Sequence, residues 1–108
     1  MFTTKVGDNN LSVTFDETVQ KELKNNFVSP AEIYKLVLNF AGSLLAVKKD
    51  EEFYIANEET GASMVLNMKW TSEHDVTVHV MKTTNIIDEK NKHIDLTPKT
   101  AESVANQQ

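Results

Sequence analysis

Residues 62–82 read ASMVLNMKWTSEHDVTVHVMK, and this stretch decides the fold. Apolar and polar residues alternate from Ala62 to Trp70 and again from Asp75 to Lys82. A period of two is typical of strands that bury one face against a core. The short connection at 71–74 predicts that the two strands pair in an antiparallel arrangement.

The alternation also predicts the register, because a shift of one residue would turn every valine outward. The register that keeps apolar residues together pairs Trp70–Val76, Met68–Val78 and Leu66–Val80, and, with a further strand at 53–57, Phe53–Leu66 and Ile55–Met64. The opposite face then carries the rows Glu52–Asn67–His79, Asp50–Lys69–Thr77 and Tyr54–Val65–Met81.

Upstream of this meander the pattern predicts a short strand at Leu11–Phe15 and then a helix from Glu17 to Phe27. Asp16 is the expected N-cap of that helix. Its buried stripe is expected to hold Val19, Leu23 and Phe27. Residues 44–48 are expected to form another strand, which a charged turn at 49–51 joins to the strand at 53–57.

A second helix begins at Ser29-Pro30-Ala31-Glu32, which is a capping box with proline at the first helical position. We expect it to run to about Ala41, with Gly42 closing it. At 100° per residue its apolar side chains cover an arc of about 220°, which is wider than packing on one sheet requires. The helix therefore either lies between the sheet and the first helix or docks a partner, or a second copy, around Tyr34 and Leu38.

These elements predict an α+β fold: a short N-terminal strand, two helices, and then a three- to four-stranded antiparallel β-meander with the helices packed on one face. At 108 residues the chain has the size of one domain. We expect residues 1–96 to form a single α+β domain and residues 97–108 to form a C-terminal tail or a short helix.

The charge of the chain bears on its partners. Eleven lysines and no arginine face sixteen acidic residues, so the net charge is −5. Arginine is the preferred residue for bidentate contacts to phosphate and guanine. An acidic chain without arginine argues against nucleic acid as a partner and favours a protein with a basic surface.

The chain contains no cysteine, which excludes disulfides, thiolate metal ligands and a cysteine nucleophile. The first residues do not resemble a signal peptide, and no apolar run is long enough to span a membrane. We expect a cytoplasmic protein that does not contact the membrane.

Five acidic residues are expected at one end of the sheet, because the turns at 49–51 and 71–75 lie at the same end of the meander: Asp50, Glu51, Glu52, Glu73 and Asp75. They form either a solvated end of the sheet or an acidic docking patch for a basic partner.

His79 is the best catalytic candidate, because it is the one histidine placed on a strand and facing outward. Lys69 and Tyr54 share its face and are the accompanying candidates. Nothing in the sequence identifies a nucleophile or an oxyanion hole beside them. No two histidines have the spacing of metal ligands, and the three glycines form no phosphate-binding loop, so we expect neither a metal nor a cofactor.

The layout of a strand, two helices and three or four antiparallel strands between Val13 and Lys82 resembles the RelE/ParE toxin superfamily and its BrnT-like relatives. The closest local matches are Phe15-Asp16-Glu17-Thr18-Val19 and Val28-Ser29-Pro30-Ala31-Glu32. The resemblance implies a metal-independent ribonuclease with basic and general-acid residues on the exposed face of the sheet. In this chain that face offers Lys69, His79, Tyr54 and Lys82, with no arginine.

Two functions from different classes therefore compete. The first is a non-catalytic, acidic protein-binding module, such as a small inhibitor, immunity or accessory protein of a bacterium or phage. The alternative is a RelE/BrnT-like ribonuclease toxin of a toxin–antitoxin system. The acidity, the absent arginine and the wide apolar helix favour the first. A homodimer through the second helix is compatible with either function.

Overall fold

The computed structural model describes residues 2–57, 61–88, 93–94 and 102–103. The elements, in chain order, are β1 (Phe2–Val6), β2 (Asn9–Phe15), α1 (Glu17–Asn25), α2 (Pro30–Leu38), α3 (Ala41–Leu45), β3 (Glu51–Asn57), β4 (Ala62–Trp70), β5 (Asp75–Thr84), β6 (Ile87–Asp88), β7 (His93–Ile94) and β8 (Glu102–Ser103). The fold is α+β, as the sequence predicts.

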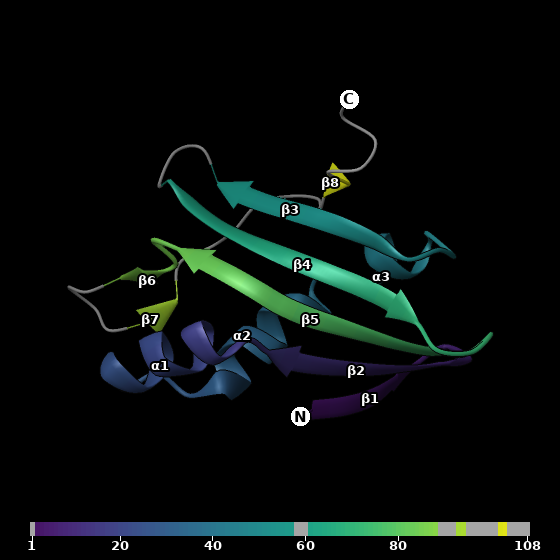
Figure 1. Cartoon of the computed structure of the whole chain (residues 1–108), viewed down its shortest axis with the longest axis horizontal. Helices are drawn as coiled ribbons and strands as arrows, with labels where there is room; N and C mark the ends of the chain where they lie inside the picture. The colour runs from purple at the N-terminus through teal and green to yellow at the C-terminus, as the bar shows by residue number, and fades with distance from the viewer. Residues whose placement is uncertain (1, 58–60, 89–92, 95–101, 104–108) are drawn as a thin grey trace.

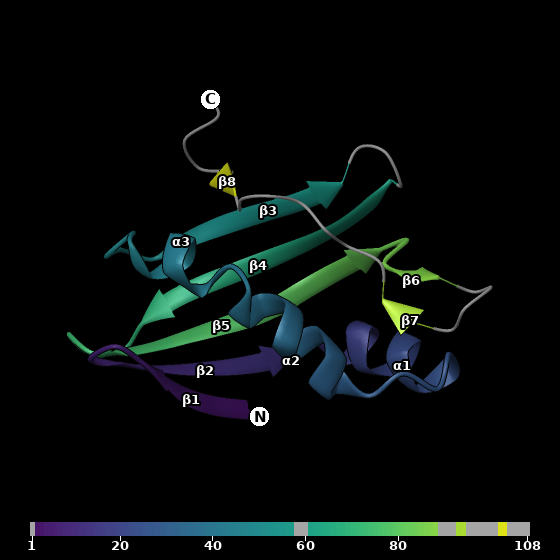
Figure 2. The same ribbon diagram turned by 180° about the vertical axis from the view of Figure 1, so that it is seen from behind.

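One sheet organises the molecule, with the strand order β1-β2-β5-β4-β3-β8 (Figure 1). The strands β3, β4 and β5 form the predicted antiparallel meander, whereas β2 lies parallel to β5. Seen from behind, α2 and α3 cross one face of the sheet, and α1 follows the end of β2 (Figure 2). The other face, toward the viewer in Figure 1, has no described helix over it.

The predicted register is confirmed in every core pair named above. Glu52 lies opposite Asn67, and Asn67 lies opposite His79, so that row of the outer face is also confirmed. An irregularity between Val65 and Leu66 shifts the next row. Val65 therefore pairs with Lys82, and Met81 is the extra residue of a β-bulge.

The N-terminal hairpin was not predicted. Phe2–Val6 pairs antiparallel with β2, and Gly7 takes the positive φ of +61° that the tight turn requires. Phe2 packs edge-on against Phe15 and stacks on Tyr34 with ring centroids 4.8 Å apart. This strand explains part of the wide apolar arc of α2, because its first residue covers Tyr34.

The N-cap predictions for the first two helices are confirmed. Asp16 accepts a hydrogen bond from the Thr18 amide at the start of α1. Ser29 Oγ accepts one from the Ala31 amide at 3.2 Å, with Pro30 as the first residue of α2. The α2 face buries Ile33, Leu36 and Val37 against the core.

The expected end of α2 and the expected strand at 44–48 are wrong. Helix α2 ends at Leu38, and a separate short helix, α3, runs from Ala41 to Leu45 with Gly42 inside it. The physical reason is the spacing of the buried residues Ala41, Leu44 and Leu45, which is i, i+3, i+4 and matches a helix rather than a strand.

The prediction that Phe27 belongs to the buried stripe of the first helix is also wrong. Helix α1 ends at Asn25, and the amide of Val28 donates to the Leu23 carbonyl while that of Phe27 donates to the Lys24 carbonyl. This is a Schellman motif, which places Phe27 at the position usually taken by glycine. Phe27 has a φ of +57° and a side chain that is 90% exposed. The left-handed conformation costs a non-glycine residue roughly 1–2 kcal/mol.

The core lies between the helices and the covered face of the sheet. Its largest fully buried side chains include Leu11, Leu23, Ile33, Leu44, Ile55, Met64, Leu66 and Met68. Most of the expected tail at 97–108 lies outside the described residues, and Glu102–Ser103 forms β8 beside β3.

Candidate functional site

His79 lies near the middle of the uncovered face of the sheet, on β5 between β2 and β4. The register places Thr14 on one side of it and Asn67 on the other. Its side chain is 35% exposed, so a ligand on this face could reach the ring. The sequence prediction that His79 faces away from the core is confirmed by this position.

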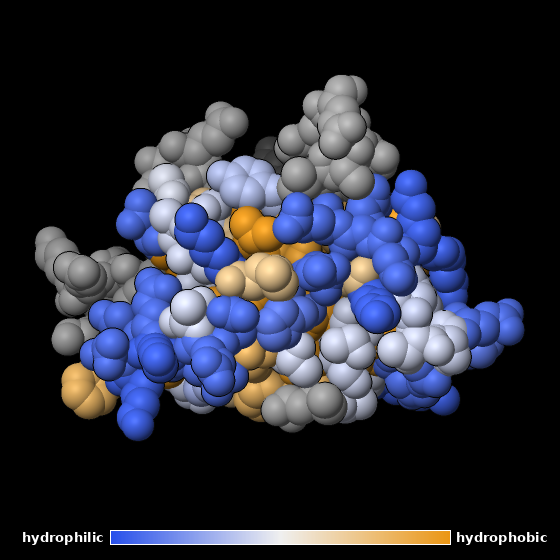
Figure 3. Space-filling model, viewed as in Figure 1, coloured by the Kyte–Doolittle hydropathy of each residue, from blue (hydrophilic) through white to orange (hydrophobic). Residues whose placement is uncertain are grey.

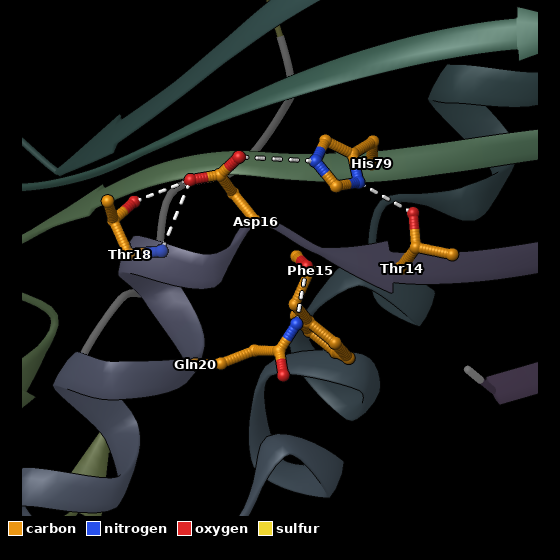
Figure 4. Close-up of polar contacts among 6 residues, drawn as sticks. All are labelled: Thr14, Phe15, Asp16, Thr18, Gln20 and His79. Atoms are coloured by element: carbon orange, nitrogen blue, oxygen red, sulfur yellow. Dashed lines mark hydrogen bonds and ion pairs between the residues drawn. The ribbon is translucent and has the colours of Figure 1, made fainter.

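Two residues on the β2–α1 segment hold the imidazole of His79 (Figure 4). The hydroxyl oxygen of Thr14 lies 2.7 Å from Nδ1, and the Asp16 carboxylate oxygen Oδ1 lies 3.7 Å from Nε2. In the neutral ring one nitrogen donates and the other accepts, whereas in the protonated ring both donate. In the protonated state, therefore, Nδ1 donates to Thr14 and Nε2 faces a carboxylate.

Asp16 has a structural role besides facing His79. Its Oδ2 accepts hydrogen bonds from both the hydroxyl and the amide of Thr18, at 2.7 and 3.2 Å (Figure 4). These bonds hold the pKa of the Asp16 carboxyl below its ordinary value, with a smaller lowering contribution from His79 and a partial offset from desolvation. Asp16 thus stays ionised and links the start of α1 to β5.

The order Thr14–His79–Asp16 resembles a nucleophile, a base and an orienting carboxylate. Among the described residues, no free pair of backbone amides lies beside this group to form an oxyanion hole. Residues 76–80 of β5 pair with β2 on one side and with β4 on the other, so their backbone amides are used in the sheet. The site is also part of a broad sheet face rather than a pocket. The geometry is that of a partly exposed histidine held by Thr14 and Asp16 on the face of a sheet.

The structure does not bring Lys69 and Tyr54 next to His79. Lys69 lies opposite Thr77, one row along the sheet, and Tyr54 lies two strands away on β3. Strand geometry puts about 12 Å between the Tyr54 and His79 positions. The three catalytic candidates share a face without forming one compact catalytic group.

The five acidic residues expected at one end of the sheet differ in their surroundings. Asp50 Oδ1 accepts a hydrogen bond from the Trp70 amide at 2.7 Å, which joins the start of β3 to the end of β4. Asp75 accepts bonds from Ser72 and Asn10, and these lower the pKa of its carboxyl. Both carboxylates stabilise turns and strand ends in addition to carrying charge.

Glu51 is not exposed with the others. Its side chain is 1% exposed and lies on the covered face of the sheet, with Lys49 Nζ at 3.8 Å. Within the described part of the chain, the exposed carboxylates of Glu52 and Glu73 have no hydrogen bond or ion pair. Cations also lie at this end, since Lys48 Nζ bonds to Asn9 and to the Glu73 carbonyl. Glu52 and Glu73 are thus the most available to a partner.

Tyr34 and Leu38, the expected docking residues on the second helix, are partly buried and pack against the core. Phe2 covers one face of the Tyr34 ring. The second helix therefore presents less free apolar surface than its sequence pattern indicates.

The uncovered sheet face has exposed apolar side chains of its own. Tyr54 is 39% exposed and Met81 is 38% exposed, and the half-buried Val65 pairs with Tyr54 and lies beside the bulge at Met81. Figure 3 shows hydrophobic side chains in the middle of this face, surrounded by hydrophilic ones. We call Tyr54, Val65 and Met81 the apolar strip.

Thr14 and Asp16 were not predicted to lie beside His79. The sequence analysis predicts only a strand at Leu11–Phe15, which contains Thr14, and identifies Asp16 only as a helix cap. Both come to His79 through the parallel pairing of β2 with β5. The polar side of Leu11–Phe15 signals an outward Thr14, but no local pattern indicates which strand lies beside it.

Among the residues that the structure describes, no group of three histidine or acidic side chains is arranged to hold a metal ion. The same residues form no helix that is long and apolar enough to cross a membrane. No protein-family model matches this chain, and no curated protein or solved structure matches it significantly.

Proposed function

We propose that this protein is a non-catalytic binding module that engages another protein through the uncovered face of its sheet. The observation that carries this proposal is the apolar strip on that face, beside the hydrogen-bonded His79. Two of the three most exposed large hydrophobic side chains in the described chain, Tyr54 and Met81, belong to it.

This composition matches the centre of a protein–protein interface. Tyrosine and methionine are enriched there, and the surrounding rim is polar. In this protein the polar rim includes Asn67, Thr77 and His79. The imidazole of His79 is held by Thr14 and Asp16. A rigid sheet orders few side chains on binding, which lowers the entropic cost of association.

The charge of the chain favours a partner with a basic surface. The net charge is −5, and Glu52 extends the row of His79 toward the edge of the face. Charges of this kind act mainly on the rate of encounter and lose their effect as salt rises. The absence of cysteine suits the reducing cytoplasm, where we place this function.

The test is affinity capture from the source cells with three immobilised baits: the native protein, Tyr54→Ser/Met81→Ser, and Lys35→Ser as the control on the exposed side of α2. We expect a protein that the native and control baits retain and the double variant does not. Binding of that protein, once purified, should weaken at least tenfold in the double variant. Because Tyr54 and Met81 are only 39% and 38% exposed and lie in or beside strand pairs, each substitution should lower the stability of the fold by about 1 kcal/mol.

A partner that binds all three baits equally would contradict the use of this face. A partner whose association rate does not change with salt would contradict the charge argument. Circular dichroism of each bait excludes unfolding as the cause of a loss.

A ribonuclease of the RelE or BrnT kind is the second candidate, and the position of His79 favours it. This histidine is accessible on the exposed sheet face, where the family resemblance implies a general acid or base, and Asp16 faces its Nε2. The separation of Lys69 and Tyr54 from His79 and the absence of arginine count against it. RNA cleavage by the native protein that His79→Ala abolishes would replace the binding proposal with this one.

A further inference from the structure

The most anomalous residue in the described chain is Phe27, and the proposed function does not use it. The Schellman motif at the end of α1 requires a left-handed residue at this position, and glycine or asparagine would supply one with less strain. The phenylalanine side chain is 90% exposed, so it contributes almost nothing to the core. A residue that breaks a local rule without benefit to the fold points to a functional role.

A hollow lies beside Phe27. Its volume is about 810 Å³, and it lies between one face of α1 and the start of α2 at Ser29 and Pro30. The exposed side chain of Phe27 forms one wall of it, and the buried side chains Leu23 and Val28 also line it. The same patch of surface therefore carries an exposed aromatic side chain and an apolar hollow large enough to receive one.

The α1 wall of the hollow is a stripe of exposed residues at helical spacing: Glu17, Gln20, Lys21 and Lys24. Glu17 and Lys24 are two turns apart on the same side of the helix. Antiparallel packing of this stripe against its own copy brings Glu17 of each chain opposite Lys24 of the other. Phe27, just beyond the end of α1, then reaches the part of the partner's hollow beside Glu17.

We propose that a second copy of this chain occupies the hollow, in a two-fold dimer in which each Phe27 enters the hollow of its partner. A two-fold interface must be complementary to itself, and this patch has both a projecting ring and a hollow, and both an acid and a base at matching positions. Lys21 of each copy comes near the axis, and its exposed side chain is free to turn outward. This surface differs from the apolar strip, so a dimer leaves the proposed partner face open.

The first test is sedimentation equilibrium of the full chain over a range of concentrations. The native protein should show a monomer–dimer equilibrium, and Phe27→Gly should raise the dissociation constant of the dimer at least tenfold. At a low concentration where both proteins are monomeric, the same substitution should raise the thermal midpoint, because glycine relieves the left-handed strain. A side chain that served only the fold would instead give a lower midpoint.

The second test uses the symmetry of the proposed pairing. Glu17→Lys should weaken the dimer because it places two cations opposite each other, and Glu17→Lys/Lys24→Glu should restore the native dissociation constant within about threefold, about 0.6 kcal/mol. Tyr54→Ser/Met81→Ser should dimerise as the native protein does, which separates this inference from the proposed function.

A native protein that stays monomeric at every concentration overturns the inference, and so does a charge swap that fails to restore the dimer while remaining folded. If the native protein is monomeric and Phe27→Gly loses a captured protein, the hollow belongs to that protein instead.

Discussion

The carboxylate of Glu51 lies on the helix-covered face of the sheet, where its side chain is 1% exposed. Neither of its oxygens has a hydrogen-bond partner among the described residues, and Lys49 approaches only to 3.8 Å. A buried polar group in this state costs about 1–3 kcal/mol of stability. The strand pattern itself places Glu51 with Phe53 and Ile55, so its inward position was available from the sequence.

We predict that Glu51→Met increases the free energy of unfolding by about 1–3 kcal/mol, because methionine removes the unsatisfied carboxylate and keeps the volume. Urea denaturation measures the change. Glu52→Gln is the matched control on the exposed face and should stay within about 0.5 kcal/mol of the native protein. A lower stability of Glu51→Met would mean that the carboxylate has a partner outside the described residues.

Asp16 makes the stability of the folded protein depend on pH in the acidic range. The two hydrogen bonds from Thr18 lower the pKa of its carboxyl below the ordinary value of 3.8, to which the pKa returns on unfolding. The unfolded chain therefore binds a proton first as pH falls. The stability from this carboxylate is fully present well above pH 3.8 and is lost as pH falls through the folded-state pKa.

We predict that the acid branch of the stability curve is shallower in Asp16→Asn than in the native protein, since asparagine can cap the helix but does not titrate. Thermal midpoints measured from neutral pH down to below pH 3.8 check this. Asp8→Asn, at an exposed position in the β1–β2 turn, is the control for the removal of one negative charge. Parallel curves for Asp16→Asn and the native protein would contradict the role of this carboxylate.

At the scale of elements, the sequence predicts well wherever one strand or helix carries its own signal. The alternation of β4 and β5 was sufficient for their register from Leu66 to Trp70, because the buried valines allow one pairing only, but it did not predict the bulge at Met81. The prediction from periodicity was wrong at α3. Leu44 and Leu45 were assigned to a strand, although their spacing from Ala41 is helical. The sequence analysis also did not predict β1, whose short alternating pattern precedes the Gly7–Asp8 turn.

The Ser29 N-cap is the local signal that can be tested most directly. We predict that Ser29→Ala lowers the free energy of unfolding by about 1 kcal/mol, because the Ala31 amide loses its acceptor at 3.2 Å. Ser29→Asp should retain most of the stability, since aspartate also caps helices. Thermal or urea denaturation measures both variants. An unchanged Ser29→Ala protein would show that water replaces the serine without cost.

At the scale of the whole molecule, the candidate site depends on contacts that no local pattern contains. The face of each strand could be predicted, and with it the outward position of His79. The parallel pairing of β2 with β5 could not, because periodicity identifies the face of a strand and not its neighbour. Without that pairing Thr14 and Asp16 stay unconnected to His79. Phe27 was misplaced for a similar reason, since helical periodicity does not show where a helix ends.

The distribution of charge over the molecule leads to a final prediction. Lys69 and Lys82 lie on the uncovered sheet face, but Asp16 and Glu52 lie there as well, so the face has no continuous basic surface. Affinity for nucleic acid comes largely from lysine and arginine that release counterions from phosphates. A chain with a net charge of −5 and no arginine lacks this contribution and repels the polyanion.

We therefore predict that the native protein binds duplex DNA and mixed-sequence RNA more weakly than about 10⁻⁴ M at physiological salt, the weak end of ordinary non-specific binding. Fluorescence anisotropy of labelled oligonucleotides measures this, with a basic nucleic-acid-binding protein as the positive control. Lowering the salt should change little, because few phosphates are neutralised. A micromolar complex that weakens steeply with added salt would contradict the prediction. Such a complex would also favour the ribonuclease over the binding module. An RNA substrate can reach His79 only if binding overcomes the repulsion between its phosphates and the acidic protein.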